Sequence, residues 1–200
     1  MNLRFFKSLL VGLSILLTFP SLAQEAESSN YSKEEFIQDF KNGVLLVRLQ
    51  DRSLSMSEME KRGMTEQMEA LAAQQRRENR EIMLSFKSTF NFCPVYFFYA
   101  KNSEAIRSGD FTGKVFDANL EPVDISTGGS IFTAEFGETE KLGIDGLIIR
   151  DSQMLALKEP LPYFERRYVF FGLIERSKAR MIELYNKKLH DYDKLFEKGA

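Results

Sequence analysis

Two uninterrupted apolar runs with a long amphipathic segment between them constrain the fold of this chain more than any other feature. Val44–Leu49 follows Gly43, and residues 95–100 follow Pro94. Runs of this kind are typical of strands that are buried on both faces. The apolar residues of 58–88 recur with a helical period. Strand, helix and strand form a βαβ unit, so we expect two parallel strands in one sheet with a right-handed crossover.

The crossover segment is expected to form one long helix over residues 58–88. Two overlapping capping boxes can begin it, Ser57 with Glu60 or Ser55 with Glu58, because each places a hydroxyl three residues before a carboxylate. The apolar face of this helix is made by Met64, Met68, Leu71, Ile82 and Phe86.

The second half of the chain predicts smaller elements. Residues 103–108 favour a short helix that ends at a glycine, and residues 131–136 alternate like a half-exposed strand. Residues 147–150 and 154–157 flank a turn and predict a hairpin. Residues 177–197 carry an apolar stripe at helical spacing and predict a terminal helix packed on the sheet, with His190 on its opposite side. The fold class is therefore α/β: a mixed sheet with a βαβ unit, a C-terminal β-hairpin and a packed terminal helix.

This order of elements is loosely similar to that of thioredoxin-like folds. Catalytic members of that family carry Cys-x-x-Cys just after the first core strand, whereas residues 50–57 of this chain contain no cysteine. The family's cis-proline before the hairpin is also missing, because residues 143–146 occupy the matching place. The resemblance thus implies an order of elements without dithiol redox chemistry.

The N-terminus has the layout of a cleavable signal peptide over residues 1–23. Arg4 and Lys7 precede an apolar run over residues 9–19, which is too short to span a bilayer, and residues 21–23 offer a small-x-small cleavage site. We therefore expect export to a periplasmic or extracellular location, with no membrane span after signal removal. Residues 24–33 read as a flexible leader, and residues 34–200 as a single α/β domain.

Charge and the scarcity of two residue types exclude several classes of function. The chain has 27 basic and 29 acidic residues and no basic stripe interleaved with aromatics, so nucleic acid is not an expected partner. Cys93 and His190 are the only cysteine and histidine. An intramolecular disulfide and a Cys/His zinc site are therefore impossible, and a Ser-His-Asp triad would need His190.

Two kinds of sulfur-bearing residue are candidate functional groups. Cys93 can be a nucleophile, a redox sensor or an intermolecular bridge, but its apolar setting favours a buried structural thiol. Thioethers can bind Cu(I), but Met59 lies roughly opposite Met64 and Met68 along one helix, so three sulfurs converge only if Gly63 breaks that helix. Core packing is the better interpretation. No metal or cofactor is assigned.

Ligands of open α/β sheets bind beyond the carboxyl ends of parallel strands, which directs attention to the loops after the two apolar runs. Asp51, Arg52 and Lys101 lie there and are candidate ligand-binding residues. Arg166 and Arg167, in a compact charged and aromatic cluster, are candidates for an anion or partner site. Ordinary solvated surface charge is the competing interpretation of all five.

These observations favour an exported, non-catalytic α/β module that binds an unknown protein or small-molecule partner. One alternative is an exported enzyme that uses Cys93 or loop carboxylates, for which Glu135, Glu138, Asp145 and Asp151 are placed near strand ends or the hairpin. Another is an assembly component of the cell envelope, with the polar stretch 74–81 as an exposed partner surface.

Overall fold

The computed structural model describes residues 32–125, 129–140, 142–157, 161–170 and 172–197. The signal peptide expected at residues 1–23 and most of the expected leader lie outside these residues. The helices are α1 (Lys33–Asn42), α2 (Ser53–Lys61), α3 (Thr65–Thr89), the 3-10 turn η1 (Ala100–Asn102), α4 (Ser103–Arg107) and α5 (Lys178–Glu197). The strands are β1 (Val44–Leu49), β2 (Val95–Tyr99), β3 (Val115–Phe116), β4 (Ile131–Glu138), β5 (Asp145–Arg150), β6 (Phe164–Arg166), β7 (Tyr168–Val169) and β8 (Ile174–Glu175).

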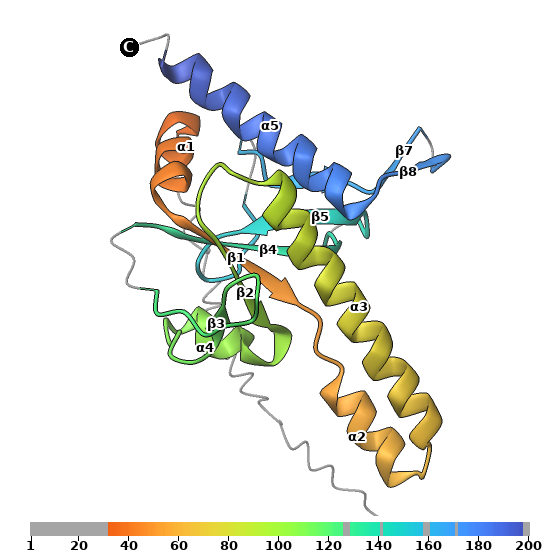
Figure 1. Cartoon of the computed structure of the whole chain (residues 1–200). Helices are drawn as coiled ribbons and strands as arrows, with labels where there is room; N and C mark the ends of the chain where they lie inside the picture. The colour runs from red at the N-terminus through yellow and green to blue at the C-terminus, as the bar shows by residue number, and fades with distance from the viewer. Residues whose placement is uncertain (1–31, 126–128, 141, 158–160, 171, 198–200) are drawn as a thin grey trace, which may run out of the picture.

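Six strands form one mixed sheet in the order β3-β2-β1-β4-β5-β6. Strand β1 is central and runs parallel to both β2 and β4, whereas β3, β5 and β6 pair antiparallel with their neighbours. The predicted βαβ unit with parallel strands is confirmed, and its connection consists of α2 and α3 (Figure 1).

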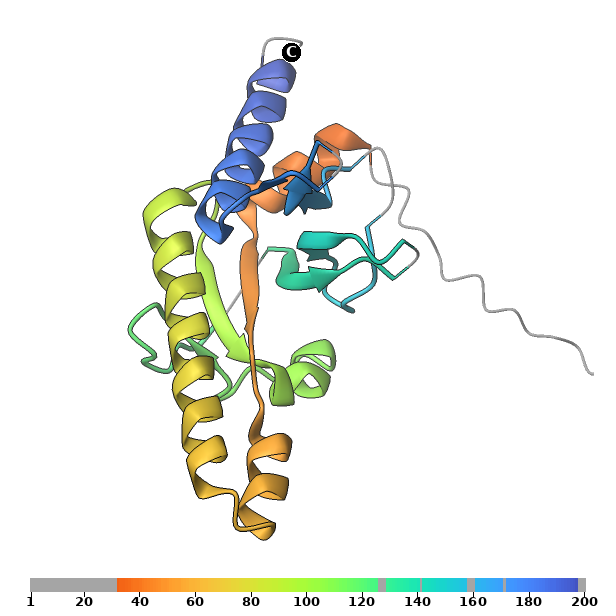
Figure 2. The same cartoon turned by 90° about the vertical axis from the view of Figure 1, so that its right-hand side faces the viewer.

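The two faces of the sheet are covered differently. Helices α1, α3 and α5 pack on one face, which we call the helical face, and Phe36, Phe86 and Tyr185 join the main core there. The other face carries α4 over β1, β2 and β3, with Leu46, Phe98 and other buried side chains forming a smaller core. Figure 2 shows α3 and α4 on opposite sides of the sheet. We call this second side the α4 face.

The crossover is broken into two helices, so the expectation of one helix over residues 58–88 is wrong. Gly63 has a φ of +69°, a left-handed conformation that glycine adopts readily and that ends a helix. Neither predicted capping box begins a helix: α2 begins at Ser53, whose backbone N–H donates to Asp51 Oδ1 over 2.9 Å. The α2–α3 pair extends beyond the sheet (Figures 1 and 2). Core packing of the methionines is therefore wrong: Met64 and Met68 are only half-buried and belong to neither core.

The polar stretch 74–81 is only partly solvated, because three of its side chains hold the loop after β1. Asn79 bonds both backbone groups of Gln50, accepting from its N–H over 2.8 Å and donating to its carbonyl over 2.9 Å. The Arg52 N–H donates to Gln75 over 2.6 Å, and its guanidinium donates to Glu78 over 2.7 Å. We call these contacts the loop clamp.

A C-terminal two-strand hairpin exists, but it is β7–β8 and not the pair expected at residues 147–157. Only Arg150 and Ala156 bridge there. Asp151 Oδ1 accepts the backbone N–H groups of Gln153 and Leu155, so the chain turns too tightly to build a second strand. Strand β5 pairs instead with β4.

The ends of the described chain are helical. Helix α1 begins one residue earlier than the predicted domain, at a capping box of Ser32 and Glu35. Helix α5 confirms the packed terminal helix, with Met181, Tyr185 and Leu189 fully buried. His190 does not point away from the fold, because its Nε2 lies 2.8 Å from Asn91 Oδ1. No helix in the described ranges combines the length and apolarity that a membrane crossing needs.

Candidate functional site

A row of side chains crosses the α4 face from β1 to β6. Arg48, Glu135, Ile148 and Phe164 are successive neighbours in it, because β4 pairs Glu135 with Ile148 and β5 pairs Ile148 with Phe164. Arg48 donates to Glu135 over 2.7 Å from β1. The row therefore changes from charged to apolar as it passes from the centre of the sheet to its β6 edge.

The charged end of the row is a cluster in which two arginines share one carboxylate. Arg48 Nη1 bonds Glu135 Oε2, and Arg150 Nε bonds Glu135 Oε1 over 2.8 Å. Arg150 Nη1 also donates to Glu140 over 2.8 Å. This Arg48–Glu135–Arg150 cluster lines a pocket of about 200 Å³ together with Arg107 and Ser103 of α4.

The charges of the cluster balance, because Glu135 and Glu140 face Arg48 and Arg150. Burial opposes the charge on Arg150, but the bonds to Glu140 and Glu135 outweigh this and raise the pKa of its guanidinium. Arg48 Nε is buried and has no hydrogen-bond partner among the described residues. Glu140 is 71% exposed, so an incoming anion can replace it on Arg150 at little cost.

The apolar end of the row forms the floor of a larger groove of about 580 Å³. Ile148 and Phe164 belong to the sheet, and Leu142 and Ile144 of the β4–β5 connection line the groove beside them. Arg150 and Glu140 line this groove as well as the smaller pocket, so the two hollows adjoin at the ion pair. The groove volume lies in the range of small-molecule sites, about 300–1,000 Å³.

Two positions of the sheet beside the apolar floor of the groove are glycines and carry no side chain. Gly137 on β4 pairs with Gly146 on β5. Because successive residues of a strand point to opposite faces, Gly137 lies on the α4 face with Glu135 and Thr139. A Cβ at Gly137 would meet no atom within 4 Å, whereas one at Gly146 would collide with the backbone of Glu165. Gly137 is therefore a position where a side chain can fill space without displacing the fold.

The structure brings together two of the sequence-predicted ligand residues. Asp51 and Lys101 follow β1 and β2, and their charged groups lie 3.7 Å apart. Burial opposes the charge on Asp51, but bonds from Ser53 and the nearby Lys101 lower its pKa overall. Arg52 is engaged in the loop clamp with Glu78. These charges have structural partners, and none of the three lines the groove or the smaller pocket.

The two other predicted residues separate. Arg166 ends β6, is exposed and lines the apolar groove. Arg167 turns to Asp145 and Glu175, at 2.9 and 3.0 Å, and fixes the base of the β7–β8 hairpin. Of the five candidates, Arg166 is the one that lines the groove.

Cys93 lies on the helical side, packed against the main core just before β2. Burial raises the pKa of its thiol to about 12, although a bond from the Leu45 backbone acts weakly in the other direction. The fully buried Tyr185 has a pKa raised well above its usual value, first by burial and then by Cys93 and Glu165. A thiol in this state is almost wholly protonated at neutral pH, so the environment suits a structural residue.

The carboxylates considered for catalysis serve different local contacts. Glu135 belongs to the arginine cluster, Asp145 pairs with Arg167, and Asp151 caps a turn. Glu138 lies opposite Asp145 at the end of the β4–β5 ladder. Their contacts do not form an acid and base pair around one reacting position.

Within the described ranges, no group of three or more His, Cys, Asp and Glu side chains could hold a metal ion. Met59 and Met64 line one cleft of about 400 Å³ between α2 and α3, together with Glu58 and Arg62, whose charges are opposite.

Sequence reasoning missed Arg48 and Arg150 and placed Glu135 only among possible catalytic acids. A signal was present, because Arg48 interrupts an otherwise apolar strand, and a charge placed there is stabilised by a partner. Comparisons with protein-family models, curated proteins and solved structures found no match to this chain.

Proposed function

We propose that this chain is an exported, non-catalytic binding module whose groove on the α4 face takes a ligand with an apolar body and an anionic group. The observation that carries the proposal is the continuity between the apolar groove and the Arg48–Glu135–Arg150 cluster through Arg150. An apolar chain would lie on Ile148 and Phe164, and its anionic end would take the place of Glu140 on Arg150. The signal-like N-terminus supports export to a periplasmic or extracellular location.

Binding is better supported than catalysis. The cluster consists of side chains that hold charge and orient a ligand, and the half-buried, protonated Cys93 lies on the other side of the sheet. The expected similarity to the element order of thioredoxin-like folds stays a prediction, and the single cysteine leaves no Cys-x-x-Cys motif for dithiol chemistry.

The absence of tryptophan from the sequence makes a direct binding test available. Leu142 is 76% exposed at the groove, so L142W places a single reporter there without disturbing the core. Oleic acid is expected to change its fluorescence in a saturable way and to bind at least about tenfold more tightly than methyl oleate, which lacks the charge. L195W, on an exposed position of α5, is the control and should show no saturable change.

Adding G137V to L142W tests the location of the ligand. Valine favours strands, and a Cβ at this position would meet no atom within 4 Å, so the protein should fold while oleate binding falls. Unchanged oleate affinity in L142W/G137V, with native stability, would show that the ligand does not occupy the groove.

Two charge variants of L142W should act in opposite directions. R150Q removes the guanidinium shared by both hollows and should abolish the preference for oleate over its ester. E135Q frees Arg48 and Arg150 from their common carboxylate and should raise oleate affinity several-fold. If both variants bind oleate as L142W does, the cluster is not the anion site.

A further inference from the structure

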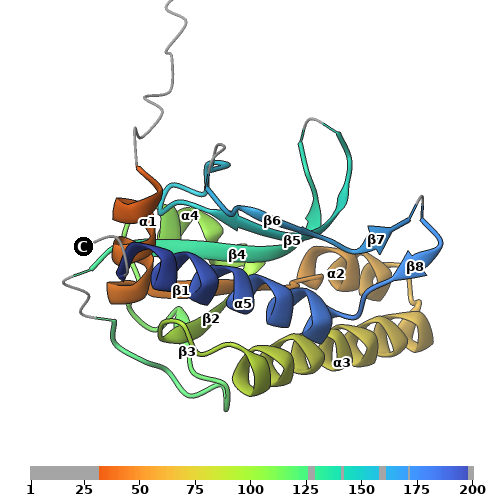
Figure 3. The ribbon, with the colours of Figure 1, turned by 90° about the horizontal axis from the view of Figure 1, so that it is seen from above.

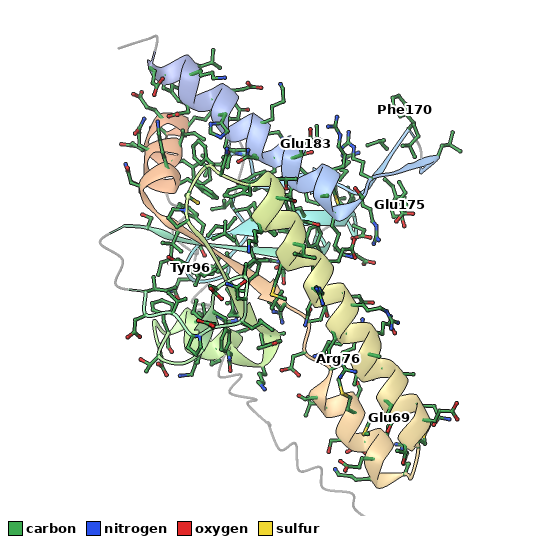
Figure 4. The ribbon with its side chains drawn as sticks, in the orientation of Figure 1. Glu69, Arg76, Tyr96, Phe170, Glu175 and Glu183 are labelled. Carbon is green, nitrogen blue, oxygen red and sulfur yellow. The ribbon has the colours of Figure 1, made fainter. Side chains whose placement is uncertain are left out.

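The β7–β8 hairpin carries large apolar side chains where they contact little of the chain. Leu173 is 85% exposed, Phe170 70% and Ile174 50%. Figures 1 and 3 show the hairpin projecting from the body, and Figure 4 labels Phe170 at its outer end. Exposed apolar groups gathered on a protruding element mark an interaction site.

The hairpin is held firmly at its base. Arg167 binds Asp145 on β5 and Glu175 on β8, and its backbone N–H donates to the Asp145 carbonyl over 2.9 Å. The Arg176 N–H donates to the Arg167 carbonyl over 2.8 Å. The tip is therefore presented by an anchored element, which lowers the entropy lost when it binds.

Residue types change in a fixed order along the hairpin. Phe170 and Leu173 lie at the tip, Tyr168 lies at the first rung of the ladder opposite Glu175, and Arg166 and Arg167 precede it. The Arg167 guanidinium lies 5.8 Å from the centre of the Tyr168 ring. The surface of a bilayer changes in the same order, from hydrocarbon through the glycerol region to the phosphates. These three layers favour apolar, aromatic and arginine side chains, respectively.

A protein partner fits this element less well. A specific protein interface buries about 800 Å² and about 20–30 residues on each side. The hairpin has eight residues and projects away from the surface that would have to supply the remainder. A lipid surface needs only the tip to enter.

We propose that the β7–β8 hairpin inserts its tip into the surface of a lipid bilayer, with Tyr168 and Arg166 at the level of the headgroups. The apolar side chains supply most of the attraction. Cations of this region are largely paired, as Arg167 is with Asp145, Lys178 with Glu81 and Arg180 with Glu183. Attachment should therefore depend only weakly on anionic lipid and on salt.

Co-sedimentation of the mature chain with vesicles tests this. The protein should co-sediment with vesicles of phosphatidylcholine and also with vesicles of equal parts phosphatidylcholine and phosphatidylglycerol. F170S/L173S should lower the partition coefficient on both by at least about tenfold, because two apolar side chains no longer leave water. L54S is the matched control, since Leu54 is 84% exposed on α2, well separated from the hairpin in Figure 1, and it should bind as the parent does.

A tryptophan at the tip gives a second measurement that does not depend on sedimentation. L173W is expected to shift its emission to shorter wavelength when either vesicle is added, and L195W is not. The proposal is overturned if the parent protein binds neither vesicle, if F170S/L173S binds as tightly as L54S, or if only phosphatidylglycerol vesicles bind. Groove titration with L142W remains separate, because Leu142 lies outside the hairpin.

Discussion

Cys93 shows how the environment of one residue decides between chemistry and packing. The same thiol near a cation or a helix N-terminus would be a nucleophile, but here it packs on the main core and its pKa is raised to about 12. At pH 8 only about one thiol in 10⁴ is ionised at that pKa. The chain therefore keeps a free cysteine without exposing a reactive one.

This raised pKa predicts a specific loss of stability in alkali. Above about pH 9 the unfolded thiol ionises while the folded thiol stays protonated, so the unfolded state binds fewer protons and stability falls as pH rises towards about 12. The contribution is fully present below pH 9 and declines by about 1.4 kcal/mol per pH unit above it. Denaturation of C93A across this range should have a shallower decline than the parent protein.

Tyr185 also titrates late, but both proteins contain it, so their difference isolates the thiol. Parallel stability curves for the parent and C93A would mean that Cys93 ionises as readily in the folded state as in the unfolded state. Labelling by a thiol reagent at neutral pH should be slow in the native protein and fast in denaturant.

At the scale of elements, helix α3 does more than cross the sheet. Its C-terminal half buries Ile82 and Phe86 in the core, and the loop clamp ties its middle to the chain as β1 ends. Without the loop clamp, the α2–α3 pair would be joined to the sheet only by the core side chains of α3 and by its connections to β1 and β2. The clamp thus fixes where α2 begins.

Removing the clamp should be costly. N79A leaves the partly buried N–H and carbonyl of Gln50 without their partners, and we expect the free energy of unfolding to fall by about 2–4 kcal/mol. Hydrogen exchange at the amides of Gln50 and Arg52 should accelerate more than exchange in β4. R76A, an exposed neighbour on the same helix labelled in Figure 4, should change stability by less than about 0.5 kcal/mol. Equal stabilities of N79A and R76A would contradict the clamp.

Elements with a long periodic pattern could be predicted from the sequence, and short ones could not. Strands β1 and β2 and helix α5 each carry an apolar signal of several residues, so their types and the parallel pairing were accessible. Strands β3, β7 and β8 have two residues each, too few to show any period. A break at Gly63 was considered but not predicted, because apolar positions continue on both sides of it.

The candidate site was harder to predict from the sequence than the fold, for a physical reason. Arg48, Glu135 and Arg150 come from three strands and meet only when the register of β1, β4 and β5 is known. That register depends on the conformations of the connecting loops. The sequence shows how long these loops are, but not which conformation they adopt. Arg166 could be proposed because its cluster is local, whereas a pair such as Arg48 and Glu135 required coordinates.

At the scale of the whole molecule, the groove and the hairpin are neighbours in the chain. Arg166 lines the groove and stands two residues before Tyr168, where the hairpin begins. If the tip enters a bilayer, the groove is held close to the lipid surface, where amphipathic molecules with an anionic end are concentrated. The two proposals then describe one arrangement, in which attachment shortens the path of a ligand into its site.

This arrangement predicts that loss of the tip slows ligand uptake without weakening ligand binding. In the L142W background, F170S/L173S should bind oleate from solution with the parent affinity, because the groove is intact. Oleate supplied in phosphatidylcholine vesicles should reach the groove about tenfold more slowly, in proportion to the lost partition of protein onto the vesicle. Stopped-flow fluorescence of the single tryptophan measures both, with L142W/L54S as control. Equal transfer rates for the two variants would mean that the ligand leaves the vesicle through water before it meets the protein, and that the hairpin serves attachment alone.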